Sequence, residues 1–252
     1  MNDVAIIGDT GLLGTSIKKK IETNHYFNTN NINLFDPDVC VSFPQVDNII
    51  FLAGDPRIFY YRNKPGLCFK NNYELIKNIL NKKTKNFIYI SSVCVYKDIS
   101  NYSKNNSTGW NDYSKFYGIS KLFSEYEIIS KLDNYCIIRL STPVNQNMLK
   151  GPLFDLKINK SYTSENSEYS FIHTDDVTNA IVHIIENQLN GVFNLTANKS
   201  IPLDSFIDDI GSIKFLSKDV IKYDSDNISL CSTGWHPQVN IIEWFYNKYN
   251  PR

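Results

Sequence analysis

The chain has 252 residues, carries 26 basic and 26 acidic side chains, and is 42% hydrophobic. This length is typical of one α/β domain, alone or with a small appendage, and the apolar fraction excludes global disorder. A net charge of zero argues against sequence-independent binding to nucleic acid, and no apolar run is long enough to span a membrane. The N-terminus lacks the basic and apolar regions of a secretory signal. Five scattered cysteines, none in a C-x-x-C pair, indicate reduced thiols in a cytoplasmic protein and predict no metal site.

Short apolar runs alternate with longer amphipathic segments, which is the pattern of an α/β fold. The runs show little internal alternation, as expected of parallel strands that are buried on both faces. Strands are predicted at residues 4–7, 32–35, 49–52, 87–90, 135–140 and 192–195. Helices are predicted at residues 12–22, 67–82, 113–131, 175–188, 203–211 and 241–249. This order predicts a doubly wound Rossmann-type parallel sheet, with ligands at the carboxyl ends of its strands.

A glycine-rich turn directly follows the first predicted strand and begins the first helix. Gly8 permits a tight turn, Gly11 lets the backbone approach a pyrophosphate, and Gly14 lets the helix pack closely on the strand. Backbone amides at the start of the helix then face the phosphates. A turn without a ligand is the alternative, but the coincidence of strand, turn and helix favours a dinucleotide site. Its predicted residues are Gly8, Thr10, Gly11, Leu12, Leu13 and Gly14.

Asp36 follows the predicted second strand, where a carboxylate can accept hydrogen bonds from the adenosine ribose and repels a 2′-phosphate. No arginine occurs before Arg57, and no lysine lies between Lys20 and Lys64. NAD is therefore favoured as the cofactor, with NADP possible and a plain turn at residues 36–38 as the alternative. The connection that follows is too short for a further strand with its crossover, so residues 39–43 are expected to be a short edge strand or a loop.

Tyrosine and lysine four residues apart lie on one face of a helix, where the ammonium can lower the tyrosine pKa toward the working range. The spacing alone is weak evidence, because three such pairs occur: Tyr60/Lys64, Tyr73/Lys77 and Tyr117/Lys121. The last pair follows Ser91-Ser92, which end a predicted strand at the edge where ligands bind. A serine hydroxyl there can hydrogen-bond the reacting oxygen while Tyr117 moves its proton.

Together these elements resemble the extended short-chain dehydrogenases, the NAD-dependent epimerase/dehydratase family that acts mainly on nucleotide sugars. The likeness covers nearly the whole chain, including residues 8–14, 51–54, 72, 91–96, 171–177 and 234–237. It implies Ser92, Tyr117 and Lys121 as catalytic residues. It also implies a homodimer formed through helices 67–82 and 113–131, which light scattering would report as twice the chain's 29.1 kDa. The resemblance further implies cofactor contacts from Leu52, Ala53, Gly54, Tyr117, Lys121 and Pro143, and substrate contacts from Cys94, Val95 and Thr142.

The resemblance implies two parts of the chain. Residues 1–144 are expected to form the NAD(P)-binding core with the catalytic helix. Residues 145–252 are expected to complete the sheet, at about 170–196, and to form a small C-terminal substrate-binding lobe. The segments that would cover the substrate, residues 145–169 and 197–232, are short for the family.

The residues also narrow the chemistry that the resemblance implies. The family's 4,6-dehydratases carry Asp-Glu directly after the active Thr, and Val93-Cys94 stands there in this chain, so dehydration is not expected. The leading prediction is a nucleotide-sugar 4-ketoreductase or 4-epimerase with a Ser-Tyr-Lys relay. A reductase of a small non-nucleotide carbonyl compound is the second prediction, because the covering segments are short. A non-catalytic NAD(P)-binding regulatory protein is the third, because Thr142-Pro143 departs from the family's usual Asn-Val.

Overall fold

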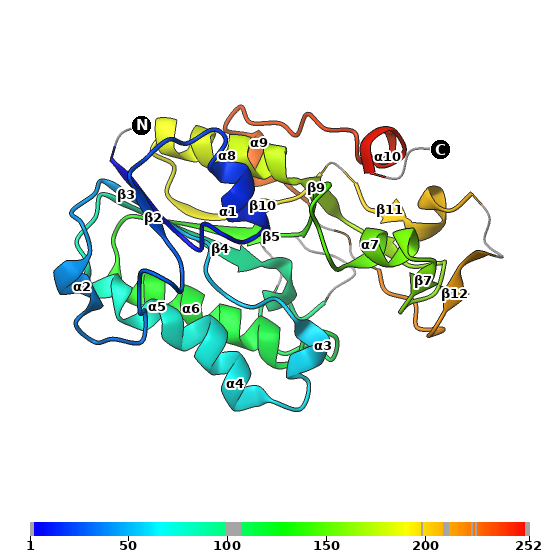
Figure 1. Ribbon diagram of the computed structural model, residues 1–252, viewed down its shortest axis with the longest axis horizontal. Coiled ribbons are helices and arrows are strands. Elements are labelled where there is room, and N and C mark those ends of the chain that lie inside the picture. The colour runs from blue at the N-terminus through cyan, green and yellow to red at the C-terminus, as the bar shows by residue number, and fades with distance from the viewer. Residues whose placement is uncertain are drawn as a thin grey trace.

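The computed structural model describes residues 3–98, 107–197, 199–208, 212–222, 224 and 226–249. Its centre is a six-stranded parallel sheet in the order β10-β5-β4-β3-β1-β2 (Figure 1). The strands are β1 (Val4–Ile7), β2 (His25–Phe27), β3 (Asn48–Phe51), β4 (Asn86–Ser92), β5 (Tyr135–Leu140) and β10 (Gly191–Leu195). The chain reverses its direction of travel through the sheet between β1 and β3. This switch point is the mark of a doubly wound fold, so the predicted fold class is confirmed.

Helices cover both faces of the sheet, and alternate residues of each strand therefore enter different cores. One face carries α1 (Leu12–Ile17) and α8 (Thr174–Glu186), which pack on Val4 and Ile6 of β1. The other face is covered by α6 and by the helical segment at residues 65–81, which pack on Ala5 and Ile7 of β1. Figure 1 shows these layers above and below the sheet. The elements of the second layer are α4 (Pro65–Phe69), η1 (Lys70–Glu74), α5 (Leu75–Lys77), η2 (Ile79–Asn81) and α6 (Phe116–Lys131).

The predicted second strand is wrong. Residues 32–35 lie in a loop, and the strand that pairs with β1 is the shorter β2, which precedes them. Two asparagines turn the chain after β2: the Asn31 side chain accepts from the Asn28 amide, and the Asn28 side chain accepts from the Asn30 amide. The apolar run at 32–35 is buried in part, since Leu34 joins the core, but it does so without strand pairing.

The connection to β3 also differs from the prediction. Residues Val39–Ser42 form a short helix, α2, in place of the edge strand or loop expected at 39–43. Val39 and Phe43 are buried, and Phe43 packs against Phe27 of β2 with ring centroids 4.7 Å apart. Packing on the end of the sheet therefore orders this segment as a helical turn.

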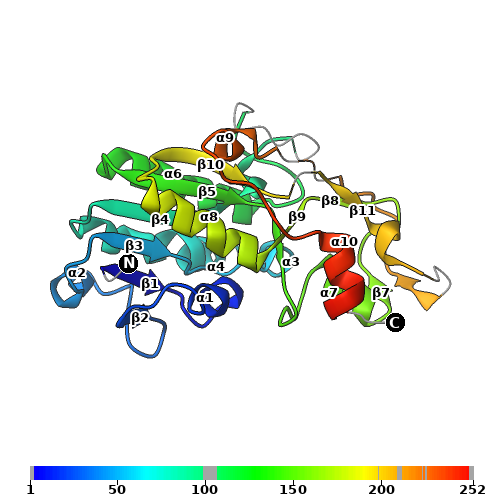
Figure 2. The same ribbon diagram turned by 90° about the horizontal axis from the view of Figure 1, so that it is seen from above.

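A second group of short elements lies beyond the carboxyl ends of the strands, at the right of Figures 1 and 2. Phe171, Phe206 and Phe245 lie at the centre of its core, with neighbouring ring centroids 5.1–5.6 Å apart. Of the predicted helix at 203–211, the 3₁₀ turn η4 (Leu203–Phe206) forms, and residues 209–211 lie outside the described residues. The other elements of this group are β6 (Thr142–Val144), α7 (Pro152–Lys157), β7 (Lys160–Ser161), β8 (Glu168–Tyr169), β9 (Phe171–His173), β11 (Ile201–Pro202), β12 (Lys214–Phe215), α10 (Ile241–Trp244) and η6 (Phe245–Tyr249). The short helix α9 (Ile228–Cys231) instead packs on β10, and its Leu230 belongs to the core of the central sheet.

Within the described residues, no helix has the length and apolar character that crossing a membrane requires.

Candidate active site

The end of β4 and the start of α6 bring a serine and a tyrosine hydroxyl together. Ser92 is the last residue of β4, and its Oγ accepts a hydrogen bond of 3.2 Å from the Cys94 amide at the 3₁₀ turn η3 (Val93–Val95). Tyr117 lies in the first turn of α6 and is 6% exposed, and Ser92 is close enough to the phenol for its hydroxyl to lower the pKa of Tyr117. The structure thus brings two of the three predicted catalytic side chains near each other.

Burial keeps the Tyr117 phenol protonated. Desolvation raises its pKa well above the usual value, the thiol of Cys94 and the hydroxyl of Tyr89 raise the pKa further, and the nearby hydroxyl of Ser92 lowers it. In this environment the phenol is a proton donor at neutral pH, ready to protonate an oxygen on which negative charge develops.

Lys121 lies one helical turn after Tyr117 and is 5% exposed. Its Nζ donates to the Ile90 carbonyl at 2.9 Å and lies 4.7 Å from the centroid of the Tyr89 ring. Burial lowers the pKa of Lys121 to about 8, while the carboxylate of Glu125 acts to raise it. The amine is therefore mostly protonated at pH 7, and its charge lies inside the site.

Two polar side chains that the sequence analysis did not single out fix the start of α6 to η3. Asn111 Nδ2 donates to the carbonyls of Cys94 and Tyr96, at 2.9 and 2.8 Å, and Ser114 Oγ donates to the Cys94 carbonyl at 3.0 Å. A Cβ on Gly118 would stand 2.1 Å from that same carbonyl oxygen. This close packing sets the distance between the phenol and Ser92. Single loop residues of these types carry no spacing signal, so only the fold reveals them.

The glycine turn after β1 has the form that the sequence predicts. Gly8 has φ of +94°, and a Cβ there would stand 2.8 Å from the Ala53 amide nitrogen. A Cβ on Gly14 would stand 2.5 Å from the Cα of Asp9. Both positions therefore require glycine, one for its backbone conformation and both for the close approach of neighbouring backbone.

The outer side of this turn is open. Thr10 and Gly11 are exposed, and a Cβ on Gly11 would meet only the Gly8 carbonyl, at 3.5 Å. Because α1 begins at Leu12, the amides of Leu12 and Leu13 have no acceptors within the helix. An exposed turn with free first-turn amides fits the pyrophosphate of a dinucleotide.

The loop after β3 joins the glycine turn to the catalytic pair. Leu52 and Ala53 are half-buried, and Ala53 lies against Gly8. The next residue, Gly54, has φ of +150°, and a Cβ there would stand 3.3 Å from Lys121 Nζ. The predicted cofactor residues after β1 and β3 and the predicted catalytic lysine therefore adjoin one another at the carboxyl ends of the strands.

Asp36 does not follow the second strand of the sheet, where the preference for NAD required it to lie. Asp36 is exposed in the loop, and Asn28 occupies the position that follows the strand. Asn28 Nδ2 donates to the carboxylate of Asp9 at 2.8 Å, and this buried carboxylate also pairs with Lys18. The side chain at the end of β2 is thus an amide backed by an ion pair. This arrangement lacks the free carboxylate on which the preference for NAD was based.

The predicted substrate residues divide into two groups. Cys94 is buried beside Tyr117 in one apolar cluster, and Thr142 and Pro143 are half-buried in β6, which pairs with β9. Val95 is fully buried in the core of the second group of elements, so the structure contradicts the prediction that it offers a surface to substrate. Among the described residues there is no cluster of three or more His, Cys, Asp or Glu side chains that could hold a metal ion.

Comparison with known protein families identifies the family of this chain. Residues 4–196 match the NAD dependent epimerase/dehydratase family, which is most of the chain, and the protein belongs to that family. The predicted resemblance is thereby confirmed. A comparison with curated protein sequences gives no match.

Solved structures with different activities share this fold. A UDP-N-acetylglucosamine 4-epimerase from Methanobrevibacter ruminantium M1 superposes with a TM-score of 0.79 and 17% identity, covering 98% of this chain and 100% of that one. A dTDP-glucose 4,6-dehydratase from Streptomyces venezuelae, solved with NAD, gives 0.77 and 14%, covering 97% of each chain. A dTDP-4-dehydrorhamnose reductase from Bacillus anthracis, solved with NADP, gives 0.71 and 16%, covering 88% and 85%. At these identities the likeness establishes the fold.

Proposed function

We propose that the protein is an NAD(P)-dependent oxidoreductase or epimerase that acts at C4 of a nucleotide-linked hexose. The observation that carries this proposal is that Ser92 ends β4 while the buried phenol of Tyr117 and the buried amine of Lys121 lie one turn apart at the start of α6, with Lys121 Nζ bonded to the Ile90 carbonyl of β4. Epimerases and reductases of sugar nucleotides are among the proteins of similar fold, which supports the substrate class.

The dinucleotide, when bound, supplies hydride transfer to or from the sugar carbon. Ser92 orients the substrate oxygen, and Tyr117 gives or takes the proton of the hydroxyl. Lys121 holds the cofactor ribose, and its charge stabilises the phenolate while the proton is away. The backbone of residues 10–13 and of Leu52, Ala53 and Gly54 would line the cofactor, with Pro143 beside it. The side chains that follow β2 do not discriminate between NAD and NADP, so the proposal includes both cofactors.

Dehydration is not part of the proposal, because Val93-Cys94 supplies no acid and base pair beside the reacting carbon. We assign the substrate lobe to the elements that follow residue 145 and the cofactor core to residues 1–144. A cytoplasmic location is proposed from the five cysteines, all of which are free thiols in the structure.

The test is incubation with NADH or NADPH and 4-keto or 4-hydroxy sugar nucleotides. Stoichiometric consumption of the reduced cofactor identifies a reductase, and interconversion of sugars without net consumption identifies an epimerase. Tyr117→Phe should lower kcat by about 10²–10⁴-fold while NADH binding persists. Tyr126→Phe, on the exposed side of the same helix, is the matched control and should keep full activity. Full activity of Tyr117→Phe would refute the proposed relay, whereas binding of NADH without turnover of any of these sugars by the wild-type protein would favour a regulatory, non-catalytic protein.

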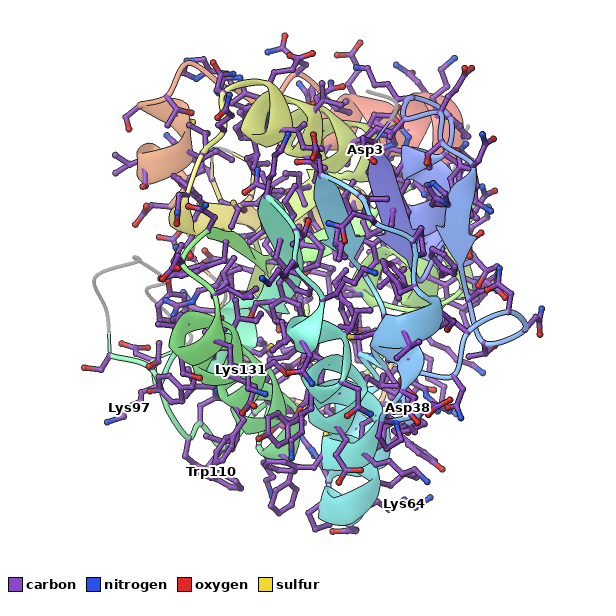
Figure 3. All side chains as sticks on the ribbon, turned by 90° about the vertical axis from the view of Figure 1, so that its left-hand side faces the viewer. Asp3, Asp38, Lys64, Lys97, Trp110 and Lys131 are labelled. Carbon is purple, nitrogen blue, oxygen red and sulfur yellow. The ribbon has the colours of Figure 1, made fainter. Side chains whose placement is uncertain are left out.

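An aromatic patch formed by Phe69, Tyr73 and Phe123 supports the homodimer that the family resemblance implies. The rings lie edge to face, with centroids 5.5–6.3 Å apart, and Phe123 is 46% exposed. The patch belongs to the helical layer of α4 and α6, which Figure 3 shows below the sheet with Lys64 and Lys131 labelled. Two copies that pair these helices would bury the exposed rings.

A further inference from the structure

A polar pocket with a volume of about 370 Å³ lies at the amino ends of the central strands, at the opposite edge of the sheet from the candidate active site. Asn86, in its lining, begins β4, and Ser92 ends that strand. At about 3.3 Å per residue the two positions are about 20 Å apart. Figure 3 shows the molecule from the side opposite the lobe, with Asp3, the residue before β1, labelled at this edge. The pocket is therefore separate from the candidate active site.

Three asparagines from neighbouring strands lie side by side in the lining. Asn48 and Asn86 begin β3 and β4 and are partners in the register of the sheet. Asn134 directly precedes β5, whose first residue, Tyr135, pairs with Phe87 of β4. Because side chains alternate between the two faces of a strand, these asparagines lie on the face that α8 covers. Their amides therefore form a row along one wall of the pocket.

The side chain of Asn86 is buried without a hydrogen-bond partner. Asn86 is 9% exposed, and its backbone is fully used: its amide donates to the Asp47 carbonyl at 3.0 Å and its carbonyl accepts from the Thr84 hydroxyl at 3.4 Å. Within the part of the chain that the structure describes, no hydrogen bond reaches its side-chain amide. An unpaired buried amide destabilises a fold, so an asparagine at this position indicates a partner from outside the chain.

The end of α8 forms a second wall of the pocket. Ile185 lies in the last turn of this helix and contributes an apolar side chain to the lining. The exposed Gln188, with φ of +50°, follows the helix and contributes another amide. The last carbonyl groups of a helix lack partners within it and carry partial negative charge. This wall therefore favours hydrogen-bond donors and disfavours anions.

The two charges in the lining neutralise each other. Lys85 Nζ lies 2.7 Å from the carboxylate of Asp47, and the other residues that line the described pocket are uncharged. A phosphate would meet one cation that is already paired, together with the negative end of α8. A hydroxyl group, in contrast, can both donate to and accept from the side-chain amides. The lining therefore fits an uncharged molecule that carries several hydroxyl groups.

We propose that this pocket is a binding site for a small carbohydrate. The amides of Asn48, Asn86 and Asn134 bind its hydroxyl groups, and Ile185 packs against an apolar face of the sugar ring. The volume of about 370 Å³ lies within the range of about 300–1,000 Å³ that is usual for small-molecule sites. Because the pocket is at the other edge of the sheet, this site goes beyond the proposed function and does not depend on it.

The experiment is saturation-transfer NMR of the full-length protein with glucose, galactose, mannose and maltose as probes. The wild-type protein should bind at least one of these sugars, and excess inorganic phosphate should displace it no more than sodium chloride of equal ionic strength. Asn86→Leu should weaken the affinity for the sugar about tenfold or more, because a hydroxyl group loses its partner. The same variant should raise the melting temperature of the free protein by about 2–4 °C, because the unpaired amide is removed.

Two further variants complete the experiment. Gln188→Gly removes a side chain of the lining at a φ of +50°, which suits glycine, so this variant keeps its fold and should also bind the sugar less tightly. Asn187→Leu is the matched control. Asn187 is exposed next to Gln188, lies outside the lining and donates to the His183 carbonyl at 2.9 Å, so its replacement should leave the affinity for the sugar unchanged.

Four outcomes would overturn the proposal. Absence of saturation transfer to all four sugars would exclude a carbohydrate site, and equal affinity of the wild type, Asn86→Leu and Gln188→Gly would show that the sugar binds elsewhere. Specific displacement by phosphate would identify an anion site instead. A lower melting temperature of Asn86→Leu would show that the protein itself satisfies the amide. Binding of NADH and turnover of sugar nucleotides test the proposed function, and their failure would leave the carbohydrate site unaffected.

Discussion

Glu125 and Arg139 form a buried ion pair beneath the catalytic helix, and removing the charge of Glu125 measures how far the site depends on it. Glu125 is 1% exposed. Its carboxylate accepts from Arg139 Nε and Nη2, at 3.1 and 2.7 Å, and from the hydroxyl of Ser91. Arg139 Nη1 donates to the Tyr96 hydroxyl at 3.0 Å, so both charged groups are enclosed by polar partners.

We expect Glu125→Gln to lower the free energy of unfolding by about 3 kcal/mol. Loss of one partner of a buried ion pair costs about 3–5 kcal/mol, because the remaining charge stays buried without compensation. The glutamine amide oxygen can still accept one hydrogen bond, which places the expected value at the lower end. Proteins are stable by about 5–15 kcal/mol, so urea denaturation followed by circular dichroism at pH 7 resolves such a loss easily.

Glu127→Gln is the matched control. Glu127 lies two residues further along α6 and pairs with Lys131 at 2.8 Å on a more exposed face, where ion pairs contribute about 0–1 kcal/mol. A second readout is the pKa of Lys121, measured by NMR of its side chain. Because the Glu125 carboxylate acts to raise this pKa, Glu125→Gln should move it below about 8. Equal losses of stability in the two variants, or an unchanged Lys121 pKa after Glu125→Gln, would refute the reasoning.

Gly118→Ala should destabilise the fold by about 3 kcal/mol and reduce kcat, because the added Cβ would overlap the Cys94 carbonyl. Gly66→Ala in α4 is its control: the added Cβ meets nothing within 4 Å, so thermal denaturation should show a stabilisation of about 0.5 kcal/mol. Burial raises the pKa of Asp155, in α7, to about 6, so its folded form binds a proton more tightly than the unfolded chain, and stability falls as pH rises from about 4 to 6. Asp155→Asn should therefore raise the free energy of unfolding by roughly 1 kcal/mol at pH 8, after allowance for partial exposure, and leave it unchanged at pH 3.5. An equal increase in stability at both pH values would contradict this prediction.

The glycine turn and the candidate Tyr-Lys pair were accessible from the sequence because they depend on short-range geometry. The strand of β1, the glycines at 8, 11 and 14, and the start of α1 lie within fourteen residues, and each residue type has a local steric reason. Tyr117 and Lys121 stood apart from the two other Tyr-Lys pairs because they follow a strand that ends in serine. In the structure the tyrosine lies in the first turn of α6, near Ser92.

The second strand shows where local pattern fails. Residues 32–35 are more apolar than residues 25–27, yet only the latter pair with β1, because the turn at Asn28 and the length of the connection decide which segment reaches the sheet edge. The loss of this strand also removed the basis for choosing NAD from Asp36.

The sequence by itself determined the alternation of strands and helices, the glycine turn and the candidates for the proposed relay, because hydrophobic periodicity and helical spacing act over a few residues. Only the tertiary structure decided which residues fix the relay in place and which charges surround it. Asn111 donates to the Cys94 carbonyl in η3, and Glu125 pairs with Arg139 of β5, through contacts between separate elements of the chain. Such pairings depend on how buried surfaces pack together, and no local spacing encodes them.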